Sequence, residues 1–425
     1  MMNSRADVTD FARKRPAFGE FVVMMAALMA SNALAIDAML PALPAIGESL
    51  DVVEDNRRQL VITVYLIGFG ISQLFYGPLS DRLGRKWLLV AGLLAYALFG
   101  LMAGLAGSFD LLLAARALQG VAAGATRVLV VSIVRDCYQG SAMARVMSLT
   151  MIVFMIVPVL APAFGQAVLA VSTWRHIFIG LGVYGAALSV WMALRLPETL
   201  APENKRSLSV RHIGEAALMT LRVRQSIGNT AALTLLMGAL FAFIGSIQQI
   251  VFDVFHRPET IALVFAFIAG PMALSSYANS RLVMRLGSRK ILMFALSAFT
   301  LASVTHLIVA LTAGESLWLF VALQALTMVF FGMIGANAGA LAMEPLGHIA
   351  GTASSLQGVI TTIGGAIIGF LIGQQFDGTT TPFLIGFAVC GGAALATAIW
   401  ANRDPCRDSH DPGEVEVQES ATRPA

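Results

Sequence analysis

The sequence predicts an all-α membrane protein of twelve transmembrane helices, arranged as two six-helix halves with pseudo-symmetry. Hydrophobic residues make up 57% of the chain and charged residues only 12%, whereas soluble domains carry about 25% charged residues. Apolar runs of about 20 residues, each long enough to cross a bilayer as a helix, recur along the chain. Strand-like alternation of polar and apolar residues is absent, so a helical bundle is the remaining way to span a membrane.

The apolar runs divide into two groups of six. The first run is too long for the core of a signal peptide and no cleavage pattern follows it, so we expect it to stay as the first span. The predicted spans are approximately 18–40, 58–77, 87–107, 110–133, 145–170, 175–195, 228–252, 259–283, 290–312, 316–341, 352–374 and 382–401. They define a cytoplasmic N-terminal tail (1–17), a first bundle (18–196), a cytoplasmic linker (197–226), a second bundle (227–401) and a disordered cytoplasmic tail (402–425).

The basic residues predict the orientation. Of the 28 Lys and Arg residues, 22 lie in segments on the side of the N-terminus, and cytoplasmic loops carry such an excess. The opposite loops contain only Arg57, Arg58, Arg175 and Arg257. Both termini are therefore predicted to be cytoplasmic.

Other classes of function find little support. The net charge of +3 is modest and the basic residues sit in loops, so no nucleic-acid partner is expected. The cysteines Cys137, Cys390 and Cys406 give neither a disulfide framework nor a metal site. There is no Gly-rich loop ending in Lys-Ser or Lys-Thr that would bind ATP. We expect a transporter driven by an ion gradient, without enzymatic activity, cofactor or metal.

A charged turn between the second and third spans, Gly77–Lys86, is the most distinctive stretch. A weaker copy at 281–290 precedes the ninth span, and such repeats occur in transporters whose substrate site lies between the two halves. Asp81 can face the positive N-terminus of a helix in the opposite half, and Arg82 or Arg85 could pair with Asp136. The expected latch, which would hold the cytoplasmic side closed, comprises Gly77, Asp81, Arg82, Gly84, Arg85 and Asp136. The alternative is that these charges only anchor the topology.

Asp37 is the carboxylate that falls most clearly within a span, in the outer part of the first one. Ionisable groups in spans are costly and usually face a cavity. Pro41 and Pro44 follow it and should break or kink the helix. Asp37 is therefore a candidate for taking up a proton from one side and releasing it when substrate arrives. The alternative is an acid near the interface that is solvated by water.

The fourth span contains Arg116 and Arg127, whose separation of about three helical turns puts both on one face. Arg116 lies at a depth similar to that of Asp37, so we expect an Arg–Asp pair that senses proton and substrate. The alternative for Arg116 is a structural tie to backbone carbonyl groups. Arg127 is a candidate for the substrate cavity, unless its long side chain reaches the cytoplasmic interface.

Further candidates are polar or helix-bending residues inside the spans. Pro158 and Pro162, four residues apart in the fifth span, should bend that helix and shape a gate. The polar candidates for the substrate cavity are Tyr65, Gln119, Gln248 and Gln249. Most such residues form hydrogen bonds between helices instead, and that alternative stays open for each of them.

The turn Gly77-Pro-Leu-Ser-Asp81-Arg82-Leu-Gly84-Arg85-Lys86 resembles the signature between spans two and three of the major facilitator superfamily. The stretch from Leu112 through Arg116-Ala-Leu-Gln119-Gly120 is similar to the fourth-span signature of proton-coupled members, in which the Arg is implicated in proton coupling. Asp37-Ala-Met-Leu-Pro41-Ala-Leu-Pro44 resembles the first-span signature of the Bcr/CflA subgroup of drug:proton antiporters. In the fifth span, the antiporter signature is reduced to Pro162 and Gly165.

The resemblance implies a proton-coupled exporter of small, fairly apolar compounds such as antibiotics. It would work by alternating access as a monomer in the bacterial inner membrane, with protons, a drug-like substrate and lipid as its partners. One alternative is a proton-linked transporter of amino acids, purines or sugars on the same fold. A membrane sensor is the other alternative, but it would need a soluble output domain, which the tail from Asn402 does not provide.

Overall fold

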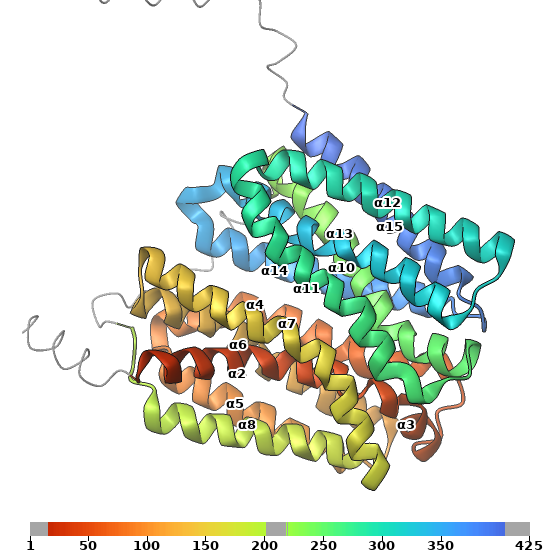
Figure 1. Cartoon of the computed structure of the whole chain (residues 1–425). Coiled ribbons are helices and arrows are strands. Elements are labelled where there is room, and N and C mark those ends of the chain that lie inside the picture. The colour runs from red at the N-terminus through yellow and green to blue at the C-terminus, as the bar shows by residue number, and fades with distance from the viewer. Residues whose placement is uncertain (1–15, 201–217, 219, 404–425) are drawn as a thin grey trace, which may run out of the picture.

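The computed structural model describes residues 16–200, 218 and 220–403, and these residues are almost entirely helical (Figure 1). Twelve helices among them are long and apolar enough to cross a membrane, which confirms the predicted number. Most of the predicted N-terminal tail, linker and C-terminal tail lies outside the described residues.

The spans form two groups of six. The first group comprises α2 (Phe18–Asp37), α4 (Leu60–Leu83), α5 (Lys86–Gly104), α6 (Phe109–Cys137), α7 (Gly140–Val171) and α8 (Arg175–Arg195). The second comprises α10 (Arg224–Gln249), α11 (Ile261–Leu286), α12 (Ser288–Ala313), α13 (Leu317–Met343), α14 (Ala350–Gly373) and α15 (Thr381–Asn402). Each group packs within itself, and the two meet mainly where α4 contacts α14 and α7 contacts α11. In Figure 1 the first group runs from red to yellow-green and the second from green to blue.

The first span is interrupted, as its prolines predict. Helix α2 ends at Asp37, and a single 3₁₀ turn at Leu40–Ala42 leads into the short helix α3 (Leu43–Ser49). Pro41 and Pro44 stand in the first turns of these two new segments. Proline is tolerated there because the first backbone N–H groups of a helix have no partner within it. The break places Asp37 at a helix end inside the bundle.

The charged stretch Gly77–Lys86 is not a loop, and this part of the prediction is wrong. Helix α4 continues through Gly77 and Pro78 to Leu83, and α5 begins at Lys86. A helix of 24 residues is about 36 Å long and exceeds the hydrocarbon thickness of about 30 Å. The charges therefore mark where the helix leaves the lipid, not where it ends. Gly84 makes the turn with a φ of 102°, a conformation that favours glycine.

The two prolines of the fifth span lie within α7, which runs through both of them. Each proline removes one backbone N–H donor from the helix. Pro162 is buried and Pro158 is half-buried.

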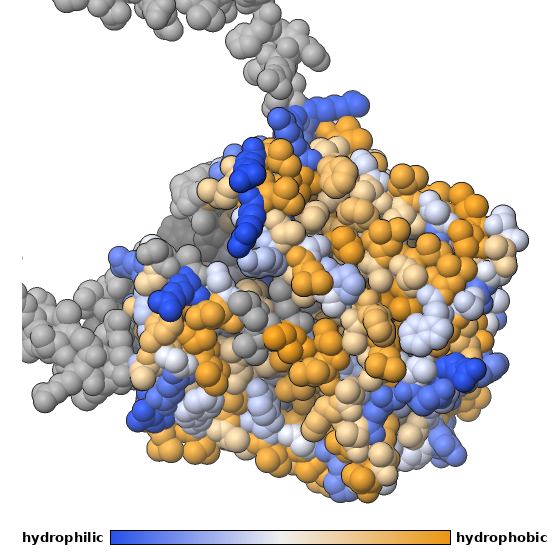
Figure 2. Space-filling view, in the orientation of Figure 1, coloured by the Kyte–Doolittle hydropathy of each residue, from blue (hydrophilic) through white to orange (hydrophobic). Residues whose placement is uncertain are grey.

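The core is continuous across the two halves, and its first-half part lies at the end of the bundle away from the termini. One cluster of buried side chains includes Tyr65 and Phe178 of the first half together with Phe243 and Phe320 of the second. A separate cluster, near the start of α2, contains first-half residues such as Met24 and Leu129. The outer surface is apolar over most of the face in Figure 2, and hydrophilic residues gather toward its margins, as expected of a membrane protein.

Candidate functional site

Four amide side chains tie the two halves together at the end away from the termini. Gln59, beside the start of α4, donates to Gln249 Oε1 of α10 at 2.6 Å and to the Gly373 carbonyl at 3.3 Å. Gln249 in turn donates to Asn56 Oδ1 at 2.8 Å. Gln374 donates to the Asn56 carbonyl at 2.8 Å, and Asn56 donates back to the Gln374 carbonyl at 3.2 Å. We call Asn56, Gln59, Gln249 and Gln374 the amide clasp.

Polar contact between the halves is weaker farther along α4 toward the termini. There Gln73 donates to Thr362 Oγ1 of α14 over 3.4 Å. The amide clasp, supported by a bond from Gln166 of α7 to the Pro258 carbonyl at 3.1 Å, is therefore the main described polar seal between the halves. In this conformation the bundle is closed at that end.

Asp37 is enclosed beside the closed end. It is 3% exposed, and its Oδ1 has no hydrogen-bond partner among the described residues. Helix α7 passes directly against the break that follows Asp37. A Cβ atom on Gly165 would collide with the Ala38 carbonyl oxygen and lie 3.0 Å from Pro41 Cγ. The absence of a side chain at Gly165 allows this approach.

Arg116 does not pair with Asp37, so that expectation is corrected. Its guanidinium donates to the carbonyl groups of Ala35 at 2.8 Å and Val61 at 3.2 Å, and to Gln119 Oε1 at 2.6 Å. It also lies 4.3 Å from the centre of the Tyr65 ring. The alternative interpretation, a tie to backbone carbonyl groups, describes Arg116 here. These bonds attach α2 to α4 and α6 at Ala35, two residues before Asp37.

The polar candidates in the first half, Tyr65 and Gln119, are fully buried; Gln119 accepts from Arg116, but its Nε2 has no hydrogen-bond partner among the described residues. Tyr65 donates to Asn32 Oδ1 at 3.0 Å, and Asn32 donates to Thr126 Oγ1 at 2.7 Å. This chain joins α4, α2 and α6. In the second half Gln249 belongs to the amide clasp, whereas Gln248 is buried with Nε2 unpartnered among the described residues. Arg127, by contrast, is exposed.

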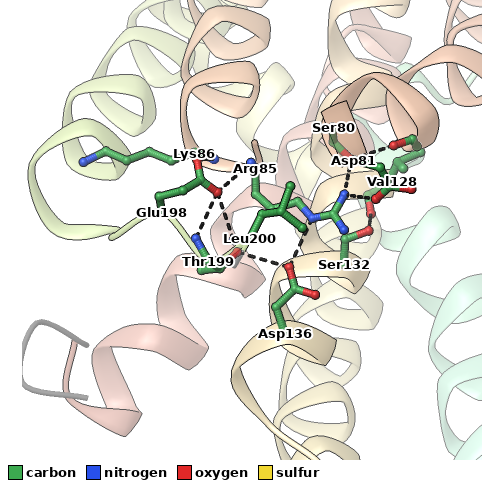
Figure 3. A network of polar contacts seen from close by, with 11 residues as sticks. Ser80, Asp81, Arg85, Lys86, Val128, Ser132, Asp136, Glu198, Thr199 and Leu200 are labelled. Atoms are coloured by element: carbon green, nitrogen blue, oxygen red, sulfur yellow. Dashed lines mark hydrogen bonds and ion pairs between the residues drawn. The ribbon is translucent and has the colours of Figure 1, made fainter. Parts of the chain in front are cut away.

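The charged residues near the termini form a network around Arg85 (Figure 3). Arg85 is buried and pairs with Asp136 Oδ2 at 3.1 Å and Asp81 Oδ1 at 2.6 Å, and it also contacts the Ser80 hydroxyl. Of the two pairings predicted for Asp136, the one with Arg85 forms, whereas Arg82 is exposed. Among the described residues, Asp81 pairs with Arg85, in the turn between α4 and α5, and its predicted contact with a helix of the second half stays a prediction.

Glu198, just after α8, completes this network and was not among the predicted site residues. Its carboxylate accepts from the backbone N–H groups of Arg85 at 2.8 Å and Lys86 at 3.2 Å. These groups belong to the N-terminus of α5, where a negative charge is stabilised by the helix dipole. Glu198 falls within the predicted linker (197–226), and nothing in its sequence position signals this contact.

A second buried ionisable pair was also missed. His306 Nε2 of α12 lies 2.7 Å from Glu315 Oε1, and both side chains are almost fully buried. Glu315 also accepts from the Thr380 hydroxyl at 2.8 Å. The position of His306 inside an apolar span was a usable signal, since ionisable groups are rare there.

The model of the family described as the Major Facilitator Superfamily matches residues 25–369. The chain belongs to this superfamily. Membership identifies it as a multi-pass membrane transporter and not an enzyme. One relative, described as an uncharacterized MFS-type transporter YdgK of Bacillus subtilis, is 31% identical over 83% of this chain and 88% of its own length.

Two other superfamily relatives have names that refer to drug resistance. The bicyclomycin resistance protein homolog of Haemophilus influenzae is 28% identical over 87% of this chain and 93% of its own length. The multidrug resistance protein D of Escherichia coli is 28% identical over 84% and 89%, respectively. The crystal structure of the human organic anion transporter MFSD10 has the same fold, with a TM-score of 0.65 and 19% identity, and covers 91% of this chain and all of that one.

Proposed function

We propose that this chain is a proton-coupled exporter of small, fairly apolar, drug-like compounds in the inner membrane of a bacterium. The proposal places both termini in the cytoplasm, as the basic residues predict, so the amide clasp lies on the outer side. The names of the two resistance-related relatives support a drug as substrate. The observation that carries proton coupling is Asp37, a buried carboxyl group in the first span with an unpartnered Oδ1.

Asp37 couples the proton to the conformational change through the cost of burying charge. An ionised carboxylate in the enclosed position beside the clasp would cost free energy. Substrate arriving from the cytoplasm is accompanied by loss of the proton from Asp37, and the ionised form then favours the conformation open to the outside. Protonation from the outer side removes the charge, releases substrate and allows the clasp to close again.

The composition of the amide clasp suits a gate that opens in every cycle. Its bonds join neutral groups, and a neutral hydrogen bond contributes only about 1 kcal/mol net because water can replace either partner. Arg116 remains bonded to the carbonyl groups of Ala35 and Val61. It thereby keeps the Asp37 segment attached to α4 and α6 while the halves rock.

The test is an Asp37→Asn variant in a pump-deficient bacterium and in everted membrane vesicles. We expect loss of the drug tolerance that the wild-type chain confers and loss of drug-induced proton release, with the protein still folded and present in the membrane. An Asp110→Asn variant is the matched control, because Asp110 is an exposed carboxylate at the start of α6. Full tolerance and proton release in the Asp37→Asn variant would overturn the assignment of Asp37.

A further inference from the structure

Arg127 lies on the interior side of α6, although it is exposed. Nearer the start of this helix, the exposed side chains of Leu111, Leu118 and Val121 are apolar, as expected of a surface that meets lipid. Arg127 is nine residues beyond Leu118, which turns it by about 180° around the helix. Arg116, on nearly the same side as Arg127, bonds to α2 and α4. The exposed Arg127 therefore faces space within the bundle.

This space borders the second half of the molecule. Val128, the residue after Arg127, lies 4.0 Å from the position that a Cβ atom on Gly77 of α4 would take. The hydroxyl of Ser355 on α14 lies 3.9 Å from the same position. The segment of α6 next to Arg127 therefore lies close to the place where α4 contacts α14. Space between the halves is where transporters of this architecture bind substrate.

Arg127 lies within the hydrocarbon layer, because it is near the middle of α6, whose 29 residues exceed the layer's thickness of about 30 Å. It is ten residues before Cys137, the last residue of α6, or about 15 Å along the helix axis. The middle of α6 is only about one helical turn away. Arginine at such a depth is costly and usually has a partner or a function.

The charged side chains inside the spans of the first half include more positive than negative groups. Among the described residues, three charged side chains lie well inside its spans, namely Asp37, Arg116 and Arg127. Arg116 bonds to carbonyl groups and to Gln119, and the described residues offer Arg127 no carboxylate within ion-pair distance. Arg127 and Asp37 are separated by about 20 Å along the bundle, since Arg116 bonds at the level of Ala35 and Arg127 lies about 16 Å beyond it. Asp37 therefore cannot neutralise Arg127.

We propose that Arg127 binds an anionic group of the transported compound, so that the substrates include amphipathic carboxylic acids and zwitterions. This proposal rests on the exporter function above and names a substrate class for it. The guanidinium has five donors in a planar fork that matches a carboxylate. An anion at this position supplies the missing counter-charge, and the substrate's apolar part replaces water against the surrounding helices. Substrate binding and proton binding then occur at separate positions, Arg127 and Asp37.

The test compares an anthracene carboxylic acid with its methyl ester, which keeps the apolar rings and removes the charge. Affinity for both probes is measured by fluorescence on the purified full-length chain, for the wild type, Arg127→Gln, Arg127→Lys and Arg135→Gln. Arg135 is the matched control, because it is another exposed arginine on α6 but lies in the last turn. Thermal unfolding of each variant reports whether the fold is intact.

The wild type should bind the acid more tightly than the ester. Arg127→Gln should weaken binding of the acid about tenfold or more, since hydrogen bonds to charged groups contribute about 1.5–3 kcal/mol, and should change binding of the ester less than twofold. Arg127→Lys should retain part of the preference, and Arg135→Gln all of it. Equal affinities of the wild type for acid and ester, or an equal loss for both probes in Arg127→Gln, would overturn the proposal.

This binding measurement is separate from the test of export. If Asp37→Asn exports normally while Arg127→Gln loses its preference for the acid, proton coupling through Asp37 is wrong and the anion site stands. If Asp37→Asn fails to export and Arg127→Gln binds the acid as the wild type does, the proposal of an anion site at Arg127 is wrong and proton coupling through Asp37 is supported.

Discussion

The two ends of the bundle are held by different chemistry. At the end away from the termini, neutral amides join one half to the other, with Gln59 bonded to Gln249. At the end near the termini, a buried arginine and carboxylates join segments of the same half, with Arg85 bonded to Asp136. Replacing a hydrogen bond between neutral groups by hydrogen bonds to water costs little free energy, whereas breaking a buried ion pair leaves an uncompensated charge. The first arrangement suits an interface that separates, and the second suits a turn that must keep its shape.

The largest expected effect is at the charged end. Arg85→Ala removes the shared partner of Asp81 and Asp136 and should lower the free energy of unfolding by about 3 kcal/mol, the lower end of the range for a buried ion pair, because the Asp81 side chain is 39% exposed. The measurement is thermal or denaturant unfolding of the purified chain in detergent. Arg82→Ala, at an exposed neighbour in the same turn, should change stability by less than about 0.5 kcal/mol. Equal losses in the two variants would mean that the network has no special role.

A smaller effect is expected where α7 packs against the broken first span. Gly165→Ala places a methyl group against the Ala38 carbonyl oxygen, and the backbone must shift. We expect a loss of about 1–3 kcal/mol in stability, together with reduced drug tolerance because Asp37 is displaced. Gly180→Ala on α8 is the control, since a Cβ atom there meets nothing within 4 Å. A stable and fully active Gly165→Ala variant would contradict the close approach.

The smallest effect on stability is expected at the amide clasp. A double-mutant cycle of Gln59→Ala and Gln249→Ala should give a coupling energy of about 1 kcal/mol, measured by thermal unfolding. The functional effect should be larger than this figure suggests, because the clasp changes in every transport cycle. A coupling energy above about 3 kcal/mol would show that the clasp is a permanent joint and would remove the contrast between the two ends.

The fold was largely predictable from the sequence, because each span is a run of apolar residues. The break after Asp37 was predictable because two prolines follow it. The end of α4 was not, because the charges at 81–86 mark the lipid boundary and the helix continues beyond it. The predicted Arg116–Asp37 pair required the rotation of α2 relative to α6, which the sequence does not encode in any single residue. The clasp was predicted only in part, through Gln249, because Asn56 lies outside the predicted spans, and Gln59 and Gln374 lie at the very ends of theirs, where polar residues commonly meet the membrane interface.

The most direct measurement of proton-driven gating is a distance across the amide clasp. Spin labels at Val53, which is 94% exposed, and at exposed Thr379 flank the clasp on the two halves. In the wild type with a bound drug, we expect a second, longer distance to appear as the pH is raised and Asp37 loses its proton. In Asp37→Asn the single short distance of the closed clasp should persist at every pH. The same pH-dependent opening in both proteins would contradict the role of Asp37.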